Sequence, residues 1–243
     1  VWAHHMYTSG MSDTAVFIFS LLTFLVAIPT AVKVFSWVAT LYKASIEMTP
    51  PLLYALVFIY LFTVGGLTGL VIGAAGTDIH VHDTQFIVAH FHFTMFGGTG
   101  FAFFAGLHYW WPKIFGVMYD FKKAYIAATL STVGFMFHYV PMFVVGMQGM
   151  PRRYYDYLPQ FAQGNALAAV GGTIMFFGLL LMLYNLMLSL KHKVVAPANP
   201  WGGVTLEWTV PSPPPVHNFV DKPVIMDYPY YFSDIVKKAA AKS

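Results

Sequence analysis

Two histidines lie two residues apart within one long apolar stretch, in residues 88–93 (VAHFHF). An ionisable side chain inside a membrane span is costly and marks a functional site by default. At ~100° per residue in an α-helix, positions i and i+2 point ~200° apart, so His90 and His92 leave opposite faces. The pair therefore indicates two separate metal or cofactor sites flanking one helix. The alternative is two polar histidines, each hydrogen-bonded to a neighbouring helix.

A second pair, His4 and His5, comes just before the first apolar stretch. Adjacent imidazoles can bind one metal ion where the chain is turned or irregular, and imidazole suits copper, iron and zinc. Two ligands are too few to hold a metal alone, so the alternative is a pair of histidines at a membrane boundary. The sequence contains no cysteine. Metal sites must then use histidine, carboxylate and the occasional methionine, which fits imidazole-bound copper, iron or haem.

A third cluster, His82 and Asp83, opens the third apolar stretch. Imidazole beside a hard oxygen ligand can bind a divalent ion such as Mg or Mn, with further ligands from elsewhere. Asp83 can equally be an acid at the start of a helix that interacts with the helix dipole. From these residues alone the second interpretation is favoured.

Lys33 lies about eight residues from the inner end of the first apolar stretch. A long lysine can snorkel to the membrane surface, which is the simpler interpretation. Thr30 lies three residues earlier on the same helix face, and Pro29 frees a backbone carbonyl that water can solvate. This face can therefore line a hydrated proton route. His108 and His138 are expected to be interfacial or hydrogen-bonded core residues.

The composition requires a membrane: 58% of the residues are hydrophobic and only 9% are charged, where a soluble domain has about a quarter charged. Five apolar stretches, about 13–41, 50–73, 85–111, 124–147 and 164–190, each exceed the ~20 residues that a span needs. Lipid-exposed backbone must satisfy its own hydrogen bonds, so all five are expected to be helices. We expect an all-α integral membrane protein, with residues 1–191 forming a transmembrane core segment.

Residues 192–243 form a polar, proline-rich tail expected on the inner side of the membrane. Its lysines, Lys237, Lys238 and Lys242, suit anionic lipid headgroups. Other lysines follow the first, third and fifth stretches: Lys43, Lys113, Lys122, Lys123, Lys191 and Lys193. By the positive-inside rule, this lysine-rich side and the C-terminus face the cytoplasm or the matrix.

Arg152 and Arg153 break this charge pattern, because they lie in a connection on the opposite, outer side. Arginine is the residue for bidentate recognition of carboxylates. The pair therefore indicates an anionic partner at the outer surface. The alternative is an ordinary surface pair neutralised by Asp156.

Taken together, the motifs closely resemble the C-terminal part of subunit I of the haem–copper terminal oxidases, the cytochrome c and quinol oxidases of respiration. The resemblance runs from residue 1 to about residue 219. It rests on VWAHHMYTSGM at 1–11, AIPTAVKVFSW at 27–37, FTVGGLTGLV at 62–71, HDT and VAHFH within 82–92, GMPRRYYDY at 149–157, LEW at 206–208 and PPPVHNF at 213–219. The implied fold is five helices of a twelve-helix bundle.

The resemblance implies roles for the four paired histidines. His4 and His5 match two of the three histidines that hold the active-site copper. His90 matches the axial ligand of the high-spin haem that faces this copper. His92 matches one of the two axial ligands of the low-spin haem, which agrees with its opposite direction on the helix.

It implies roles for the remaining candidates as well. His82 and Asp83 match the pair that binds a non-redox Mg or Mn ion, and this outweighs the helix-start interpretation of Asp83. Arg152 and Arg153 match the arginines that engage haem propionates. Thr30 and Lys33 match the K proton pathway.

The implied function is the reduction of O2 to water at a haem–copper binuclear centre, with electrons from cytochrome c and coupled proton pumping. The implied cofactors are two haems of the a type, copper, and Mg or Mn. The alternatives are a quinol oxidase of the same superfamily and a non-catalytic haem-binding membrane module. The implied location is the bacterial plasma membrane or the mitochondrial inner membrane.

The expected partners are the N-terminal part of subunit I, subunit II with its dinuclear copper domain, subunit III, cytochrome c and membrane lipid, with no nucleic acid. The third copper histidine and the second axial ligand of the low-spin haem are expected in the part that precedes Val1. The chain is thus expected to be a half-subunit. It departs from the family pattern at Gln85-Phe86, Phe96 and Met142-Phe143, which changes the surroundings of the haems and none of their ligands.

Overall fold

A computed structural model of the chain describes residues 2–219 and 223. The tail lysines Lys237, Lys238 and Lys242 lie outside the described residues. Within them the structure is helical and contains no strand, only two isolated β-bridges. The elements are η1 (Trp2–His5), α1 (Asp13–Leu41), α2 (Pro50–Gly73), α3 (Ala75–Val81), α4 (Gln85–Thr94), η2 (Met95–Gly100), α5 (Phe101–Phe115), α6 (Phe121–Met147), η3 (Pro159–Phe161), α7 (Ala162–His192) and η4 (Leu206–Trp208).

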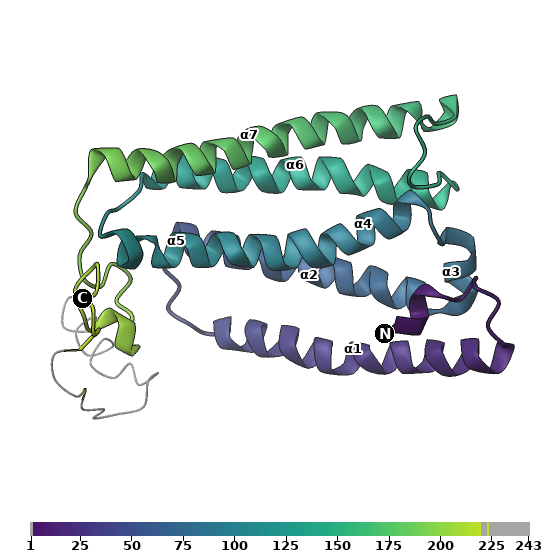
Figure 1. The fold of residues 1–243 in the computed structure, drawn as a ribbon, viewed down its shortest axis with the longest axis horizontal. Coiled ribbons are helices and arrows are strands. Elements are labelled where there is room, and N and C mark those ends of the chain that lie inside the picture. The colour runs from purple at the N-terminus through teal and green to yellow at the C-terminus, as the bar shows by residue number, and fades with distance from the viewer. Residues whose placement is uncertain (1, 220–222, 224–243) are drawn as a thin grey trace. The chain divides into compact units, whose positions relative to one another are not determined.

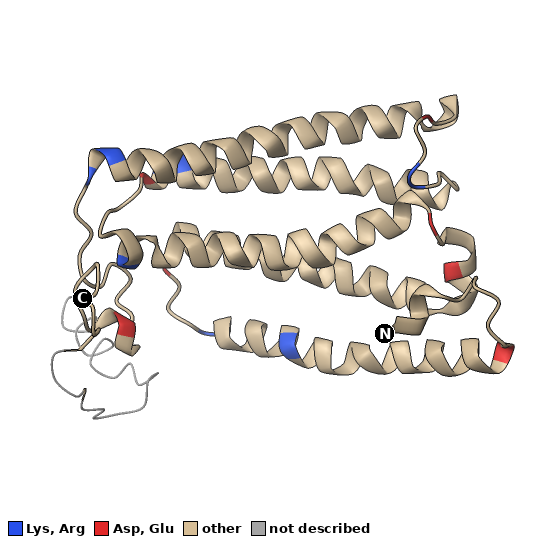
Figure 2. Ribbon diagram, in the orientation of Figure 1, with Lys and Arg blue, Asp and Glu red and all other residues tan. Residues whose placement is uncertain are grey.

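Five helical segments of the described chain are long and apolar enough to cross a membrane: Asp13–Leu41, Pro50–Gly73, Gln85–Phe115, Phe121–Met147 and Pro159–His192. The expected all-α membrane fold with five spans is confirmed. The last three segments extend beyond the apolar stretches of the sequence. Their end turns contain lysines such as Lys113, Lys122 and Lys191, which interrupt the apolar pattern but not the helix. Charged residues lie in loops and near helix ends, with Lys33 further inside α1 (Figure 2).

Local sequence signals set several helix starts. The side chain of Ser12 accepts a hydrogen bond from the Ala15 N–H at 3.3 Å and caps α1. Two prolines, Pro50 and Pro51, occupy the first turn of α2, where a missing N–H costs nothing. The third span combines α4, the π-helical turn η2 and α5.

The structure divides into two compact units. Unit 1 comprises Val1–Gly106 and Phe121–Met182, and unit 2 comprises Leu107–Asp120 and Leu183–Ser243, so α5 and α7 contribute to both. In unit 1, α2 contacts α1 on one side and α4 on the other, and α4 also contacts α6 (Figure 1). The short η1 turn lies against α1. These are the elements that position the candidate site.

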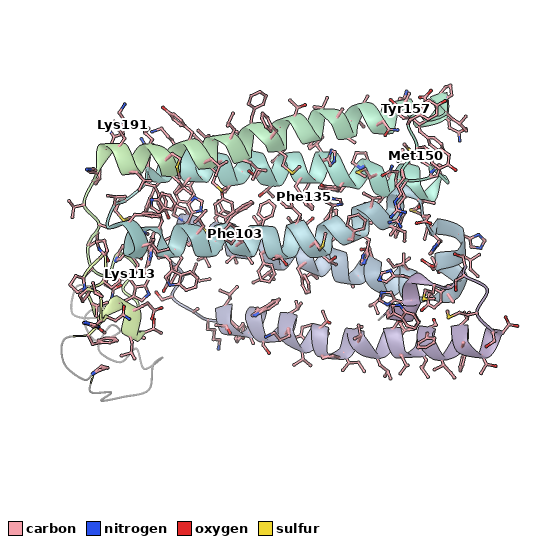
Figure 3. The ribbon with its side chains drawn as sticks, viewed as in Figure 1. Phe103, Lys113, Phe135, Met150, Tyr157 and Lys191 are labelled. Carbon is pink, nitrogen blue, oxygen red and sulfur yellow. The ribbon has the colours of Figure 1, made fainter. Side chains whose placement is uncertain are left out.

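Close approach and aromatic packing hold unit 1 together. A side-chain carbon at Gly65 of α2 would lie 2.8 Å from Thr94 Cγ2, so only glycine permits this approach of α2 to α4. Phe135, labelled in Figure 3, lies on α6. Its ring meets that of Phe93 of α4 edge to face, with centroids 4.9 Å apart. His138 donates from Nδ1 to the Ala168 carbonyl at 2.6 Å and so joins α6 to α7, which confirms the hydrogen-bonded interpretation of this histidine.

Unit 2 is organised around Lys113, whose side chain is buried. Its ammonium donates to the carbonyls of Ala198 and Val210 at 2.9 and 2.7 Å, and lies 5.0 Å from the Trp208 ring centroid. A buried charge requires such partners. This lysine therefore fixes the segment after α7 onto the end of α5.

Candidate functional site

A cavity of about 630 Å³ lies within unit 1. Its walls come from η1, α1, α2, α3 and α4, together with the loop after α6. No residue of α1 is buried, so this helix borders an open space along part of its length. Seven of the ten predicted site residues line the cavity and three do not: His4, His5, Thr30, His82, Asp83, His90 and Arg152 do, whereas Lys33, His92 and Arg153 do not.

The adjacent histidines, His4 and His5, lie on the 3₁₀ turn η1, so the chain is turned there as metal binding requires. Their Nε2 atoms are 3.0 Å apart. Two nitrogens that each bind a metal at about 2 Å lie about 3 Å from each other when their bonds are near right angles. Burial, with a smaller contribution from the neighbouring His5, lowers the pKa of His4 to about 4. The imidazole of His4 is then neutral at pH 7, which is the form that binds metal.

Oxygen acceptors hold the Nδ1 atoms of three site histidines. His92 donates from Nδ1 to the Val88 carbonyl at 2.8 Å, and a carbonyl oxygen can only accept. Nδ1 of His4 lies 3.3 Å from the hydroxyl oxygen of Thr23, and Nδ1 of His90 lies 3.0 Å from that of Thr68. A histidine whose Nδ1 carries the proton presents Nε2 as its ligand atom. His92 is thus arranged for coordination through Nε2, and the hydroxyl contacts of His4 and His90 are compatible with the same arrangement.

His90 and His92 leave α4 on different sides. The ring of His90 lies against α2, where a side-chain carbon at Gly69 would come within 3.1 Å of its Cε1. The ring of His92 stacks on the buried Tyr139 of α6, with centroids 4.6 Å apart and planes 19° from parallel. The helical spacing predicted this separation.

The His82–Asp83 cluster contains a second carboxylate, that of Asp78. His82 Nδ1 is 3.0 Å from Oδ2 of the buried Asp78, four residues earlier. Burial raises the pKa of Asp78, and the hydrogen bond from His82 opposes this rise. Thr84, not Asp83, caps α4, because the Thr84 side chain accepts from the Phe86 N–H at 3.2 Å. Asp83 therefore lies one residue before the N-cap and outside the first turn of α4.

Asp83 instead pairs with Arg152, whose Nη2 lies 2.5 Å from Asp83 Oδ1. The two loops that contain these residues are also joined through their backbones, since the Arg152 N–H donates to the Asp83 carbonyl at 2.9 Å. Among the described residues, no group of three or more His, Cys, Asp and Glu side chains forms a metal site by itself. His82 and Asp83 can then supply only part of a ligand set.

The two arginines differ in their surroundings. The Nε atom of Arg152 is buried beside the cavity and has no hydrogen-bond partner among the described residues. A buried guanidinium N–H without a partner fits an anionic group in the cavity. Arg153 is exposed and has a left-handed backbone with φ 67°.

The two proton-route candidates also differ. Thr30 lines the cavity, and its hydroxyl donates to the Val26 carbonyl at 3.0 Å. The side chain of Lys33 is exposed, with its ammonium 5.7 Å from the Trp37 ring centroid. The structure therefore places Thr30, and not the amine of Lys33, at the cavity.

The sequence did not predict that four further residues lie at the site: Thr23, Thr68, Asp78 and Tyr139. Asp78 had a usable signal, because it precedes His82 by one helical turn. The other three residues had no such signal in the sequence, because each contacts a histidine on a different helix.

The chain is similar to proteins of a known family. The family described as "Cytochrome C and Quinol oxidase polypeptide I" matches residues 1–174. The chain is 41% identical over 230 residues to cytochrome c oxidase subunit 1 of Thermostichus vulcanus, covering 95% of this chain and 42% of the relative. It is 42% identical over 229 residues to cytochrome c oxidase subunit 1 of Bacillus subtilis (strain 168), covering 93% of this chain and 37% of the relative.

A solved structure shows the same fold. It is a chain of a heme-copper terminal oxidase dimer determined by cryo-EM, with a TM-score of 0.73 and 24% sequence identity over 97% of this chain and 44% of that chain. The chain spans roughly two-fifths of the length of these relatives. The match of the family over most of the chain shows that the chain belongs to the cytochrome c and quinol oxidase polypeptide I family, subunit I of the haem–copper oxidases.

Proposed function

We propose that this chain is part of the catalytic subunit of a respiratory terminal oxidase. The assembled enzyme reduces O2 with four electrons and four protons to two molecules of water, and couples this reaction to proton pumping. One observation carries the proposal. His4, His5 and His90 line a single cavity. His92 lies on α4 like His90, but its ring faces α6 and does not line this cavity.

The residues fit the cofactors of this reaction. His4 and His5 would hold copper, and His90 would hold the iron of the high-spin haem across the same cavity. His92 would hold the iron of the low-spin haem. When bound, these groups supply the redox chemistry of O–O bond cleavage. The protein would supply the imidazole ligands, and the Val88 carbonyl that accepts from Nδ1 of His92 leaves Nε2 of that ring free to bind iron.

The residues at the outer end would bind two kinds of charged group, the anionic haem propionates and a divalent cation. Arg152, with its unpaired buried Nε, and Arg153 would bind haem propionates through charge-assisted hydrogen bonds. His82 and Asp83 would provide two ligands for Mg or Mn, with Asp78 orienting the His82 ring.

Proton delivery is assigned to Thr30 and Lys33. The lysine amine takes up a proton on the inner side and turns from Trp37 toward the cavity, where Thr30 continues the route. A side chain with four rotatable carbons can make this movement. The inner position of the C-terminus rests on the charge pattern of the loops.

The relatives named cytochrome c oxidase subunit 1 support cytochrome c as the electron donor. The proposed partners are the N-terminal part of subunit I, subunit II with its dinuclear copper domain, and subunit III. Oxidation of reduced cytochrome c by the purified complex tests the donor. Oxidation of quinol in its place would assign the complex to the quinol branch.

The ligand assignment is tested in the assembled oxidase with three single variants. His92→Ala should remove the low-spin haem signal, because its iron loses an axial ligand. His4→Ala should remove copper and leave the low-spin spectrum nearly unchanged. His80→Ala is the control, because His80 is exposed and does not line the cavity. A normal low-spin spectrum in His92→Ala would contradict the assignment.

A further inference from the structure

We propose that Tyr139 is a positioning residue for His92: its ring fixes the plane of the imidazole that would bind the low-spin haem. The inference rests on the proposed function of His92 as an axial ligand. Tyr139 lies on α6 and is buried. Its ring stacks on the ring of His92 on α4, with the centroids 4.6 Å apart and the planes 19° from parallel.

The hydrogen bond of His92 does not by itself fix the plane of the imidazole. His92 donates from Nδ1 to the Val88 carbonyl of its own helix at 2.8 Å. A hydrogen bond tolerates a deviation of tens of degrees at the donor, and the torsion that turns a histidine ring has broad minima. This bond therefore holds the position of Nδ1. A contact on the face of the ring is needed to hold its plane.

The contact with Tyr139 comes from outside the helix that carries His92. Phe91 also contacts the imidazole, with the planes 32° apart, but it is the preceding residue of α4 and moves with that helix. Tyr139 is held separately, because its ring packs on the fully buried Phe135 one turn earlier on α6, with centroids 4.6 Å apart. Helix α6 thus presents a flat, firmly packed surface to the imidazole.

Stacking on the face of the imidazole is compatible with haem binding. A coordinated imidazole stands on edge over the haem plane, so a ring stacked on its face lies beside the ligand and not between the ligand and the iron. The orientation of an axial imidazole determines how its π electrons mix with the d orbitals of iron. Tyr139 would therefore tune an electronic property of the haem without ligating it.

The test uses the complete oxidase and the electron paramagnetic resonance spectrum of the oxidised low-spin haem, whose g values depend on the imidazole planes. Tyr139→Leu removes the flat surface and keeps an apolar side chain. We expect the largest g value to shift and its line to broaden, because the imidazole samples more orientations, while the haem content stays unchanged. Tyr139→Phe keeps the ring and should keep the original g values.

Phe137 provides the control for the loss of a ring from α6. It lies two residues before Tyr139 and so leaves the opposite side of the helix, where 50% of it is exposed. Phe137→Leu should leave the g values in place. If Tyr139→Leu does not assemble, Tyr139→Met replaces it, because a flexible thioether fills the space without offering a flat face.

Unchanged g values in Tyr139→Leu, or in Tyr139→Met where leucine does not assemble, overturn the inference. An equal shift in Tyr139→Phe or in Phe137→Leu also overturns it, because the stacked ring would then not be the cause. His92→Ala separates these failures from a failure of the proposed function. If His92→Ala keeps a normal low-spin signal, His92 is not the ligand and the proposed function is wrong. If His92→Ala loses the signal while the Tyr139 variants keep the original g values, only the role of Tyr139 fails.

Discussion

At the scale of single residues, the outer cluster depends on one buried carboxylate. Asp78 holds His82 through Nδ1, so Nε2 is the nitrogen left to bind an ion. We expect Asp78→Asn to weaken binding of Mn to the assembled oxidase about tenfold, because a ligating histidine loses its orienting acceptor. Titration with Mn, followed by electron paramagnetic resonance, measures this. Asp156→Asn, an exposed change in the loop after α6, should bind Mn normally. Equal affinities in the two variants would exclude an orienting role for Asp78.

Lys33 offers a second comparison at this scale, because α1 and its end contain two exposed lysines that rest on aromatic rings. Lys33 lies 5.7 Å from Trp37 and Lys43 lies 5.5 Å from Tyr42. If Lys33 feeds protons to the cavity, Lys33→Met should stall reduction of the high-spin haem while the low-spin haem still reduces quickly. Lys43→Met should leave both unchanged. Anaerobic stopped-flow spectra separate the two haems. Fast reduction of both haems in Lys33→Met would contradict a role in proton delivery and favour a lysine that only extends to the membrane surface.

At the scale of elements, the approach of α2 to α4 determines where His90 lies. Gly69→Ala would place a carbon 3.1 Å from Cε1 of His90 and displace the ring, so the high-spin haem content should fall. Gly76→Ala, in α3, meets nothing within 4 Å and lies outside the cavity lining. An alanine in a helix is favoured over glycine by up to about 1 kcal/mol, so this control should be neutral or slightly stabilising. Haem content by the pyridine haemochrome assay compares the two. Equal haem content would show that the ring tolerates the added carbon.

The elements were also the most predictable part of the structure. The first two spans begin and end where the apolar stretches do, at 13–41 and 50–73. The opposite directions of His90 and His92 followed from helix geometry alone. The contact of Thr68 with His90 joins residues 22 positions apart on different helices, and the pairing of Asp83 with Arg152 joins two loops. Such partners depend on how the helices pack, which no local pattern contains.

At the scale of the whole molecule, the proposed function assigns to the described residues only two copper histidines and one axial histidine of the low-spin haem. A metal site with so few ligands does not hold its ion. We expect the chain expressed alone to retain neither stoichiometric copper nor the low-spin haem, and to reduce no oxygen. Expression together with the rest of subunit I should restore both. Metal analysis and an oxygen electrode provide the measurement. Robust oxygen consumption by the chain alone would contradict the proposal that it is part of a larger subunit.

The cavity beside α1 has a consequence for how the subunit is made. No side chain of α1 is buried by this chain, so a core does not fix the helix at this wall. A group that fills such a space and binds only the folded form adds its binding free energy to stability, about 2.7 kcal/mol when its concentration is a hundredfold above Kd. Haem insertion would then be a step of maturation that locks α1 in place. Cells short of haem would accumulate an immature subunit in which α1 is the helix of this chain most accessible to membrane chaperones and proteases.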